Sequence, residues 1–431
     1  MHMTTIAAID FGTSNSTVGI MSNGKPTLLS PEAGKKAVPT ALFFEAGKTN
    51  PLSGNAAIAA YSSGDNGRFM RGLKGVLGTQ LFTEATQIGF QSVTFREIIA
   101  SYIRWLLSKA EAELGTPVTH LMLGRPVHFL TNQPEADSIA EAQLREVVAS
   151  LGIKHLTFMA EPLAAAYHYE HTLKSDELAL IIDIGGGTGD FTIMRLGPTH
   201  AANADNGADR SNDILATHGL RLGGAMIDQA FALAEVMPTF GHGTLLMGPD
   251  GTTKGLTVPA GYYTQLTTWH RIHRMYEKNT LHEVRQLLAQ EAMEPKKVER
   301  LLTLLEDRAG HHLMFDVEAA KINLSSNDTT TLNLNWIERD LALHLSSEAL
   351  ATAINGWLTT LTESIHQTLA IAGITPAQLN TVFVTGGPSA MPLVQATIRA
   401  ALPESNIILG DQLTSVGTGL ILAAHRHFKG A

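Results

Sequence analysis

The chain contains no cysteine among its 431 residues, which excludes disulfide bonds, thiol catalysis and zinc sites built on cysteine. No apolar run reaches the roughly 18 residues of a transmembrane helix, and no basic start leads into the apolar core of a signal peptide. Acidic residues outnumber basic ones by 40 to 31, and no basic stripe is present. We therefore expect a cytoplasmic protein that binds neither membranes nor nucleic acid.

The composition is that of a globular protein, with 44% apolar and 16% charged residues. A chain of this length is too long for one small core, so we expect two lobes. None of the 18 histidines stands in an H-E-x-x-H motif, and there is no cysteine to join them, so a structural metal site is not predicted.

A glycine-rich stretch, LALIIDIGGGTGDFTIM at 178–194, stands out. An apolar strand, a glycine turn and a second apolar strand predict a β-hairpin. Four glycines in one tight turn expose backbone N–H groups that can surround an anion. Asp183 and Asp190 bracket this turn, and carboxylates beside a phosphate make sense when a hydrated cation lies between them. The plainer interpretation is a turn with solubilising charges.

A second copy of this plan, IAAIDFGTSNSTVGIM, lies at 6–21. It repeats the apolar strand, the aspartate (Asp10), the glycine (Gly12) and a second apolar strand. Two such hairpins in two halves of the chain favour a duplicated fold that holds phosphates between them.

The order of the predicted elements indicates an α/β architecture. Helices are expected at 96–114, 134–151 and 161–170, with buried strands at 118–123 and 156–159 between them. A helix, or two, is also expected over 339–372. No G-x-x-x-x-G-K-[ST] sequence is present, and a strand, not a helix, follows the glycines of the hairpin at 178–194. Neither a P-loop nor a Rossmann site is therefore predicted.

Six segments resemble motifs of the Hsp70 chaperones, in order along nearly the whole chain. They are the two phosphate loops (9–16 and 183–191), the connecting motif AEPLAAA (160–166), the helix EAAKINLS (318–325), the adenosine motif VFVTGGPSAMP (382–392) and, more loosely, VGTG (416–419). Together they resemble the Hsp70 branch of the actin, Hsp70 and sugar-kinase superfamily. The length and an insertion around 240–310 are similar to the short YegD-like chaperone-related proteins.

The resemblance implies a two-lobed, actin-like α/β fold in which a ribonuclease H-like motif is duplicated and the nucleotide lies in a cleft between the lobes. It also implies the following division: lobe I at 1–177, with a core of 1–38 and 118–177 and a small subdomain of about 39–117, and lobe II at 178–431, with a core of 178–228 and 332–431 and a helical subdomain of about 229–331.

The resemblance assigns roles to five charged residues. Asp10, Asp183 and Asp190 would hold Mg²⁺, mostly through water. Lys74 would reach the γ-phosphate, Glu161 would orient the attacking water or a cation shell, and Asp183 would orient or deprotonate that water. The plainer interpretations are a surface lysine at 74 and, at 161, a carboxylate in the first turn of a helix that interacts with the helix dipole.

Nucleotide contacts are implied at two groups of positions. The phosphates would meet Gly12, Thr13, Ser14, Gly185, Gly186, Gly187, Thr188, Gly223 and Gly224. The nucleoside would meet Glu318, Lys321, Ser325, Gly386, Gly387 and Ser389. For Gly223 and Gly224, plain turn glycines are an equally good interpretation, and 318–325 also fits a solvated helix face.

Two departures from the family pattern change the expectation. Ile322 and Ala390 stand where typical members place the two arginines that sandwich adenine, so we expect weaker ATP binding. The chain also ends at Ala431 without the peptide-binding domain of an Hsp70, so an autonomous foldase cycle is not implied.

The resulting expectation is an ATPase that binds ATP or ADP with Mg²⁺, and with K⁺ as a further candidate cation. Slow hydrolysis would drive lobe closure, read by an unknown protein partner, in a monomer or weak oligomer. Three alternatives remain open: a small-molecule (sugar) kinase of the same superfamily, an actin-like filament former, and a nucleotide-responsive binding module that does not hydrolyse.

Overall fold

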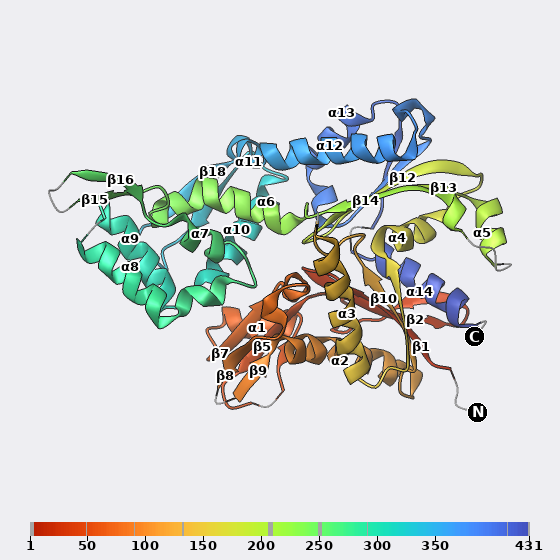
Figure 1. Ribbon diagram of the computed structural model, residues 1–431, viewed down its shortest axis with the longest axis horizontal. Helices are drawn as coiled ribbons and strands as arrows, with labels where there is room; N and C mark the ends of the chain where they lie inside the picture. Colours follow the sequence, from red (N-terminus) through yellow and green to blue (C-terminus); the bar gives the residue numbers. More distant parts are fainter. Residues whose placement is uncertain are drawn as a thin grey trace. The chain divides into compact units, whose positions relative to one another are not determined.

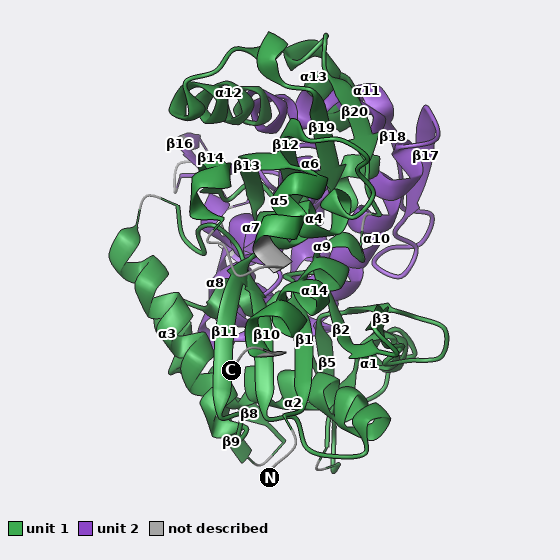
Figure 2. Cartoon of the chain, turned by 90° about the vertical axis from the view of Figure 1, so that its right-hand side faces the viewer, with its two compact units in different colours: residues 1–224, 360–390, 394–431 green, residues 225–359, 391–393 purple. Residues whose placement is uncertain are grey.

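The structure is a computed structural model (Figure 1). It describes residues 4–48, 50–89, 91–131, 133–205, 210–248, 252–290, 292–411 and 413–429. The chain divides into two compact units (Figure 2): unit 1 comprises residues 1–224, 360–390 and 394–431, and unit 2 comprises 225–359 and 391–393. The predicted lobe boundary at 177/178 lies inside unit 1 and stays a prediction.

The first large sheet of unit 1 has the strand order β11-β10-β1-β2-β3, with β4 paired to β2. Strands β1, β2 and β3 run antiparallel, while β10 and β11 run parallel to β1. The bounds are β1 (Ile6–Phe11), β2 (Asn15–Ser22), β3 (Lys25–Leu28), β4 (Ala37–Pro39), β10 (His120–Arg125) and β11 (His155–Ala160).

The second large sheet repeats this topology in the order β14-β13-β12-β19-β20. An antiparallel meander of β12, β13 and β14 is again followed by two parallel strands. The bounds are β12 (Glu177–Ile184), β13 (Gly189–Leu196), β14 (Ile214–Leu220), β19 (Thr381–Thr385) and β20 (Asn406–Leu409). The repeated strand order confirms the predicted duplicated α/β fold, with each Asp-Gly hairpin forming the first two strands of its sheet.

Two helices, α4 (Glu161–Glu170) and α14 (Ser415–Lys429), lie between these sheets (Figure 2). A single apolar cluster contains side chains from both sheets and from both helices, which gives unit 1 a shared core. Representative members of this cluster are Ala8, Met122, Ala165, Ile181, Met194 and Leu420.

Unit 1 also contains a second apolar cluster, to which several of its other helices and strands contribute. Further elements of unit 1 are β5 (Ala41–Glu45), β6 (Leu52–Ser53), α1 (Asn55–Ser62), β7 (Gly67–Arg71), η1 (Leu73–Val76), β8 (Ala85–Ile88), β9 (Gln91–Thr94), α2 (Phe95–Leu114), α3 (Pro134–Ser150), α5 (Pro198–Asp205) and, with most of their residues in this unit, α12 (Asn355–Ala372) and α13 (Pro392–Ala401).

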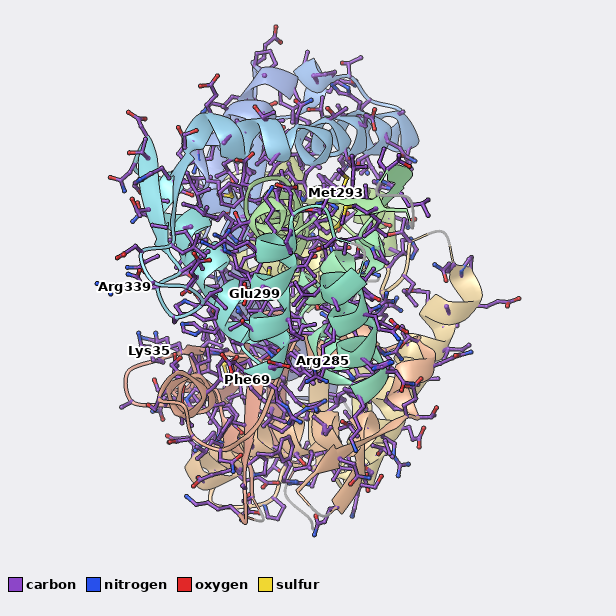
Figure 3. The ribbon with its side chains drawn as sticks, turned by 90° about the vertical axis from the view of Figure 1, so that its left-hand side faces the viewer. Lys35, Phe69, Arg285, Met293, Glu299 and Arg339 are labelled. Atoms are coloured by element: carbon purple, nitrogen blue, oxygen red, sulfur yellow. The ribbon has the colours of Figure 1, made fainter. Side chains whose placement is uncertain are left out.

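Unit 2 is mainly helical. Its elements are α6 (Gly224–Phe231), β15 (Leu245–Met247), β16 (Thr253–Thr257), α7 (Ala260–Leu266), α8 (Lys278–Gln290), α9 (Pro295–Glu306), α10 (Gly310–Leu324), β17 (Thr329–Asn333), β18 (Ala342–Ser346) and α11 (Ser347–Ala353). Helices α8 and α9 pack against each other, and Arg285 of α8, labelled in Figure 3, pairs with Glu306 of α9 at 2.7 Å.

The prediction of one or two helices over 339–372 is wrong for the first residues of that range. Residues 342–346 form β18 and pair antiparallel with β17. Along β18 the inward side chains are Leu343 and Leu345, so the apolar period is two, which fits a strand. Ser346 then accepts a hydrogen bond from the backbone N–H of Ala349 and begins α11.

Over the described residues, no helix combines the length and apolar character that crossing a membrane requires.

Candidate functional site

The first Asp-Gly loop, between β1 and β2, is held by Thr40. Its hydroxyl donates to the carbonyl oxygen of Gly12 at 2.8 Å, and its backbone N–H donates to that of Ser14 at 2.9 Å. The buried hydroxyl of Ser16 lies 2.8 Å from that of Thr40. These contacts fix the backbone on both sides of Thr13.

The second loop, between β12 and β13, is closed by its own backbone. Asp183 and Asp190 face each other in the hairpin register. The N–H of Gly185 donates to the carbonyl of Thr188 at 2.9 Å, and the N–H of Gly224 donates to that of Gly185 at 3.0 Å. Gly224 therefore ties the start of α6 to this loop.

The two loops lie so close together that a Cβ added at some of their glycines would meet a neighbouring residue. A Cβ on Gly186 would lie 2.1 Å from Ser14 Oγ, and one on Gly187 would lie 2.7 Å from Thr13 Oγ1. A Cβ on Gly223 would lie 2.4 Å from the backbone of Gly186. Three predicted phosphate-binding segments thus meet, and glycine is required where they meet.

Lys74, in the short helix η1, forms an ion pair with Glu161, the first residue of α4. Its Nζ lies 2.5 Å from Glu161 Oε1, and each residue is only 7% exposed. The interpretation of Lys74 as a surface lysine is therefore wrong. A Cβ on Gly124 of β10 would lie 3.3 Å from Glu161 Cγ and 3.6 Å from Asp10 Oδ1, so β10 presents bare backbone to both acids.

Three aspartates surround this pair and hold their protons more tightly than usual. Burial, followed by the charge of Glu161, raises the pKa of Asp10 and of Asp183 well above the ordinary value. The same two causes raise the pKa of Asp190 to about 7. Lys74 opposes all three shifts, but one ammonium does not balance four carboxylates. The cluster therefore favours an added cation.

The residues fit a hydrated divalent cation. Asp190 Oδ1 accepts from the N–H of Val127 at 2.9 Å, whereas its buried Oδ2 accepts no hydrogen bond of ordinary geometry from the described part of the chain. Within that same part, no three acidic or histidine side chains are placed to ligate a metal directly. Binding of Mg²⁺ through its water shell is the usual mode of this ion, and in that mode Asp10, Asp183 and Asp190 stay predicted to hold it.

Comparisons with known proteins show the family of the chain. The family described as "Hsp70 protein" matches residues 79–230 and 282–420, more than half of the chain. The chain belongs to the Hsp70 family. It is similar to "Chaperone protein DnaK" from each of two strains of Thermus thermophilus, at 26% identity over 449 residues in each case. The alignment covers 97% of this chain and 60% of each relative, so the chain spans well under two thirds of their length.

The Hsp70 motif at 318–325 lies on α10 in unit 2. Lys321 is buried there and pairs with Asp228 of α6 at 2.6 Å. The Ser325 hydroxyl donates to the carbonyl of Lys321 at 3.2 Å, and Glu318 is half-buried. The solvated-face interpretation is thus wrong for Lys321, while the nucleoside roles of all three residues stay predictions.

The segment 382–392, which resembles the Hsp70 adenosine motif, comprises most of β19 and the turn that follows it. Gly386 adopts φ 89°, and a Cβ there would lie 2.0 Å from the carbonyl oxygen of Ile184. The hydroxyl of buried Ser389 donates to the carbonyl of Gly386 at 2.6 Å, and Gly387 is exposed. The turn therefore needs glycine at 386 to lie against the end of β12.

Two residues of the site were not predicted from the sequence. Thr40 fixes the first loop, and Val127 orients Asp190 through its backbone N–H. Arg125 in turn holds the Val127 segment by donating to the carbonyls of Pro126 and Val127, at 3.0 and 3.1 Å. No local pattern signals these contacts, since they join distant segments or use backbone atoms.

Proposed function

We propose that this Hsp70-family chain binds ATP and ADP with Mg²⁺ and hydrolyses ATP slowly. The observation that carries the proposal is the meeting of two Asp-Gly loops, Ser14 against Gly186, beside a buried cluster of four carboxylates and one lysine. Bare backbone N–H groups suit phosphate oxygens, and excess carboxylate suits the cation that accompanies them.

Each member of the cluster has a proposed task. Asp10 and Asp190 would hold hydrated Mg²⁺, which when bound would neutralise phosphate charge. Asp183, whose raised pKa makes its carboxylate a stronger base than usual, orients the attacking water and accepts its proton. The loop glycines bring N–H groups to the phosphates without steric conflict.

Lys74 and Glu161 are proposed to act as a pair. With no phosphate nearby, Glu161 neutralises the buried ammonium at 2.5 Å. A γ-phosphate provides a competing anionic partner for Lys74, and the released Glu161 then orients water or the cation shell. The pair thus keeps Lys74 in place without leaving a buried charge unpaired.

Chaperone-related action is also a proposal, because the chain spans only 60% of relatives named as chaperones. In this proposal nucleotide-dependent lobe closure signals to a protein partner that is not identified.

The substitution of Ile322 and Ala390 for adenine-stacking arginines leads us to expect weaker ATP binding than in typical family members.

Calorimetric titration with ATP tests the binding step. The proposal predicts binding in Mg²⁺ that is much weaker in EDTA, together with little effect of added sugars and no ATP-induced light scattering. Equal affinity with and without Mg²⁺ would contradict the carboxylate cluster as a cation site. Sugar-dependent ATP consumption or ATP-dependent polymerisation would instead favour the kinase or the filament former.

A further inference from the structure

A basic groove lies in unit 1, away from the residues discussed above. It has a volume of about 630 Å³. Its lining residues come from α3, β10, β11 and the end of α14, and from the segment between α3 and β11. Its lining residues are His120, Arg145, Ala149, Ile153, Lys154, His155, Leu156, Thr157, His427 and Phe428. Every ionisable side chain in this lining is a base, although acidic residues outnumber lysines and arginines in the chain as a whole.

Two histidines of the lining stack on each other. His120 of β10 and His155 of β11 are partners in the strand register, and their rings stack with centroids 4.2 Å apart and planes 14° apart. Burial, together with the neighbouring His155, lowers the pKa of His120. Protonating both rings is unfavourable unless an anion is present to balance the charge.

Hydrogen bonds to threonine hydroxyls orient two of the histidine rings in the lining. The hydroxyl of Thr119 lies 2.8 Å from His120 Nδ1, so Nε2 is the remaining ring nitrogen. His427 Nε2 lies 3.1 Å from the hydroxyl of Thr157, which orients that ring at the edge of the groove. Phe428 packs edge-on to His120 at 5.0 Å and supplies an apolar wall.

Two residues of the lining, Arg145 and Lys154, carry permanent positive charge. Arg145 of α3 lies over the ring of Phe158 and 3.3 Å from Glu141, an acid that is not part of the lining. Lys154 precedes β11 and is exposed. A bound cation would be repelled by Arg145 and Lys154, whereas an oxyanion would be attracted by both.

We propose that this groove binds a small phosphate-class oxyanion, either inorganic phosphate or a phosphomonoester, between the stacked histidines, Arg145 and Lys154. Guanidinium and imidazolium groups both form charge-assisted hydrogen bonds to phosphate oxygens. The inference does not depend on the proposed nucleotide function, because no residue of the groove belongs to the nucleotide site.

Histidine side-chain NMR tests this inference residue by residue. The imidazole signals of His120 and His155, assigned with H120Q and H155Q, are followed during titrations with inorganic phosphate and with glycerol 3-phosphate at constant ionic strength. We expect saturable shifts of both signals near pH 6.5, the ordinary histidine pKa, and a rise in the pKa of His120. Comparison of the two titrations distinguishes free phosphate from an esterified ligand.

The key variant is R145Q/K154Q, which changes two side chains at the protein surface. We expect this variant to bind phosphate at least about tenfold more weakly. Losing even one hydrogen bond from a charged group has an effect of this size. The control is K25Q on β3, at the opposite edge of the same sheet, and its affinity should not change. The proposal is overturned if neither ligand gives saturable shifts, if chloride gives the same shifts, or if R145Q/K154Q binds as tightly as the unaltered protein.

Discussion

Lys74 Nζ lies 2.5 Å from Glu161 Oε1, and the two residues are 87 positions apart in the sequence. Their ion pair is buried, and it connects η1 with the first turn of α4 in the centre of the carboxylate cluster. Because Asp10, Asp183 and Asp190 all interact with it electrostatically, this pair sets the charge balance of the candidate site.

Removing one partner of this pair should destabilise the protein strongly. We expect K74M to lower the free energy of unfolding by about 3–5 kcal/mol, because Glu161 is left buried and unpaired. The double variant K74M/E161Q should regain most of that loss while remaining unable to hydrolyse ATP. Urea unfolding of the three proteins at neutral pH, with an ATPase assay of the double variant, measures both effects.

The exposed pair Arg96–Glu146 is the control for that series. Its side chains are 44% and 54% exposed, so R96M should cost less than about 1 kcal/mol. An equal loss in K74M and R96M, or no recovery in K74M/E161Q, would show that the buried pair does not have the assigned role.

The pKa of Asp190, about 7, predicts a pH-dependent stability. In the unfolded chain this carboxyl titrates near about 4, so between the two values the folded state binds more protons. The stability that the folded state gains by keeping the Asp190 carboxyl neutral is complete below about pH 4. It is lost as the pH rises through about 7. Above that pH, D190N should be more stable than the unaltered protein, by up to about 4 kcal/mol.

Denaturant unfolding in metal-free buffer at both ends of this pH window tests the Asp190 prediction. D190N keeps an acceptor for the Val127 N–H, so the fold of the loop should be preserved. D65N, at an exposed site, should leave the pH dependence unchanged. If D190N is less stable than the unaltered protein at alkaline pH, burying the charged Asp190 carboxylate does not destabilise the folded state, and the prediction is wrong.

Cation binding should release protons. Because the pKa values of Asp10, Asp183 and Asp190 are raised, Mg²⁺ must displace protons wherever these carboxyls are still protonated. We expect Mg²⁺ affinity to increase as the pH rises through about 7, the pKa of Asp190. Titration calorimetry in buffers of different ionisation enthalpy counts the protons released, and a pH-independent affinity with no proton release would exclude the cluster as the cation site.

The close approach of the loops predicts that G186A weakens ATP binding. The new Cβ would lie 2.1 Å from Ser14 Oγ and 2.9 Å from Ser14 Cβ, so the loops must move apart, at a cost of about 1–3 kcal/mol. Adding S14G, which removes both atoms, should restore part of the affinity. G261A on α7, where no atom lies within 4 Å of the new Cβ, is the matched control and should bind ATP normally.

Ile322 is 61% exposed on α10, so replacing it should not disturb the core of unit 2. We expect I322R to strengthen ATP binding by about 0.5–2 kcal/mol through stacking on adenine. Affinity for inorganic tripolyphosphate, which has no base, should stay unchanged. If both ligands gain equally, the added charge acts on phosphate and the assignment of Ile322 to the adenine contact is wrong.

The sequence predicts the duplicated sheets because their signal is local. Each Asp-Gly hairpin shows an apolar strand, a glycine turn and a second apolar strand within 16 or 17 consecutive residues. Helices at 96–114, 134–151 and 161–170 follow the same logic and match α2, α3 and α4 within one residue. The strand β18 was missed because its five residues adjoin a long helical pattern.

Contacts between distant segments could not be predicted. The ion partner of Lys74, the clamp of Thr40 on the first loop and the backbone bond from Val127 to Asp190 depend on tertiary packing. The stacking of His120 on His155 likewise requires the parallel register of β10 and β11, which no local spacing reveals. The family motifs supplied the candidate residues, and the structure supplied their partners.

Phosphate release from Mg-ATP by the purified protein, measured beside D183N, decides whether this site is a water-directed ATPase. We expect slow release that D183N loses while it still binds ATP, because the carboxylate at 183 acts on the attacking water. Release that D183N retains, or no release from either protein, would contradict a water-directed ATPase at this site.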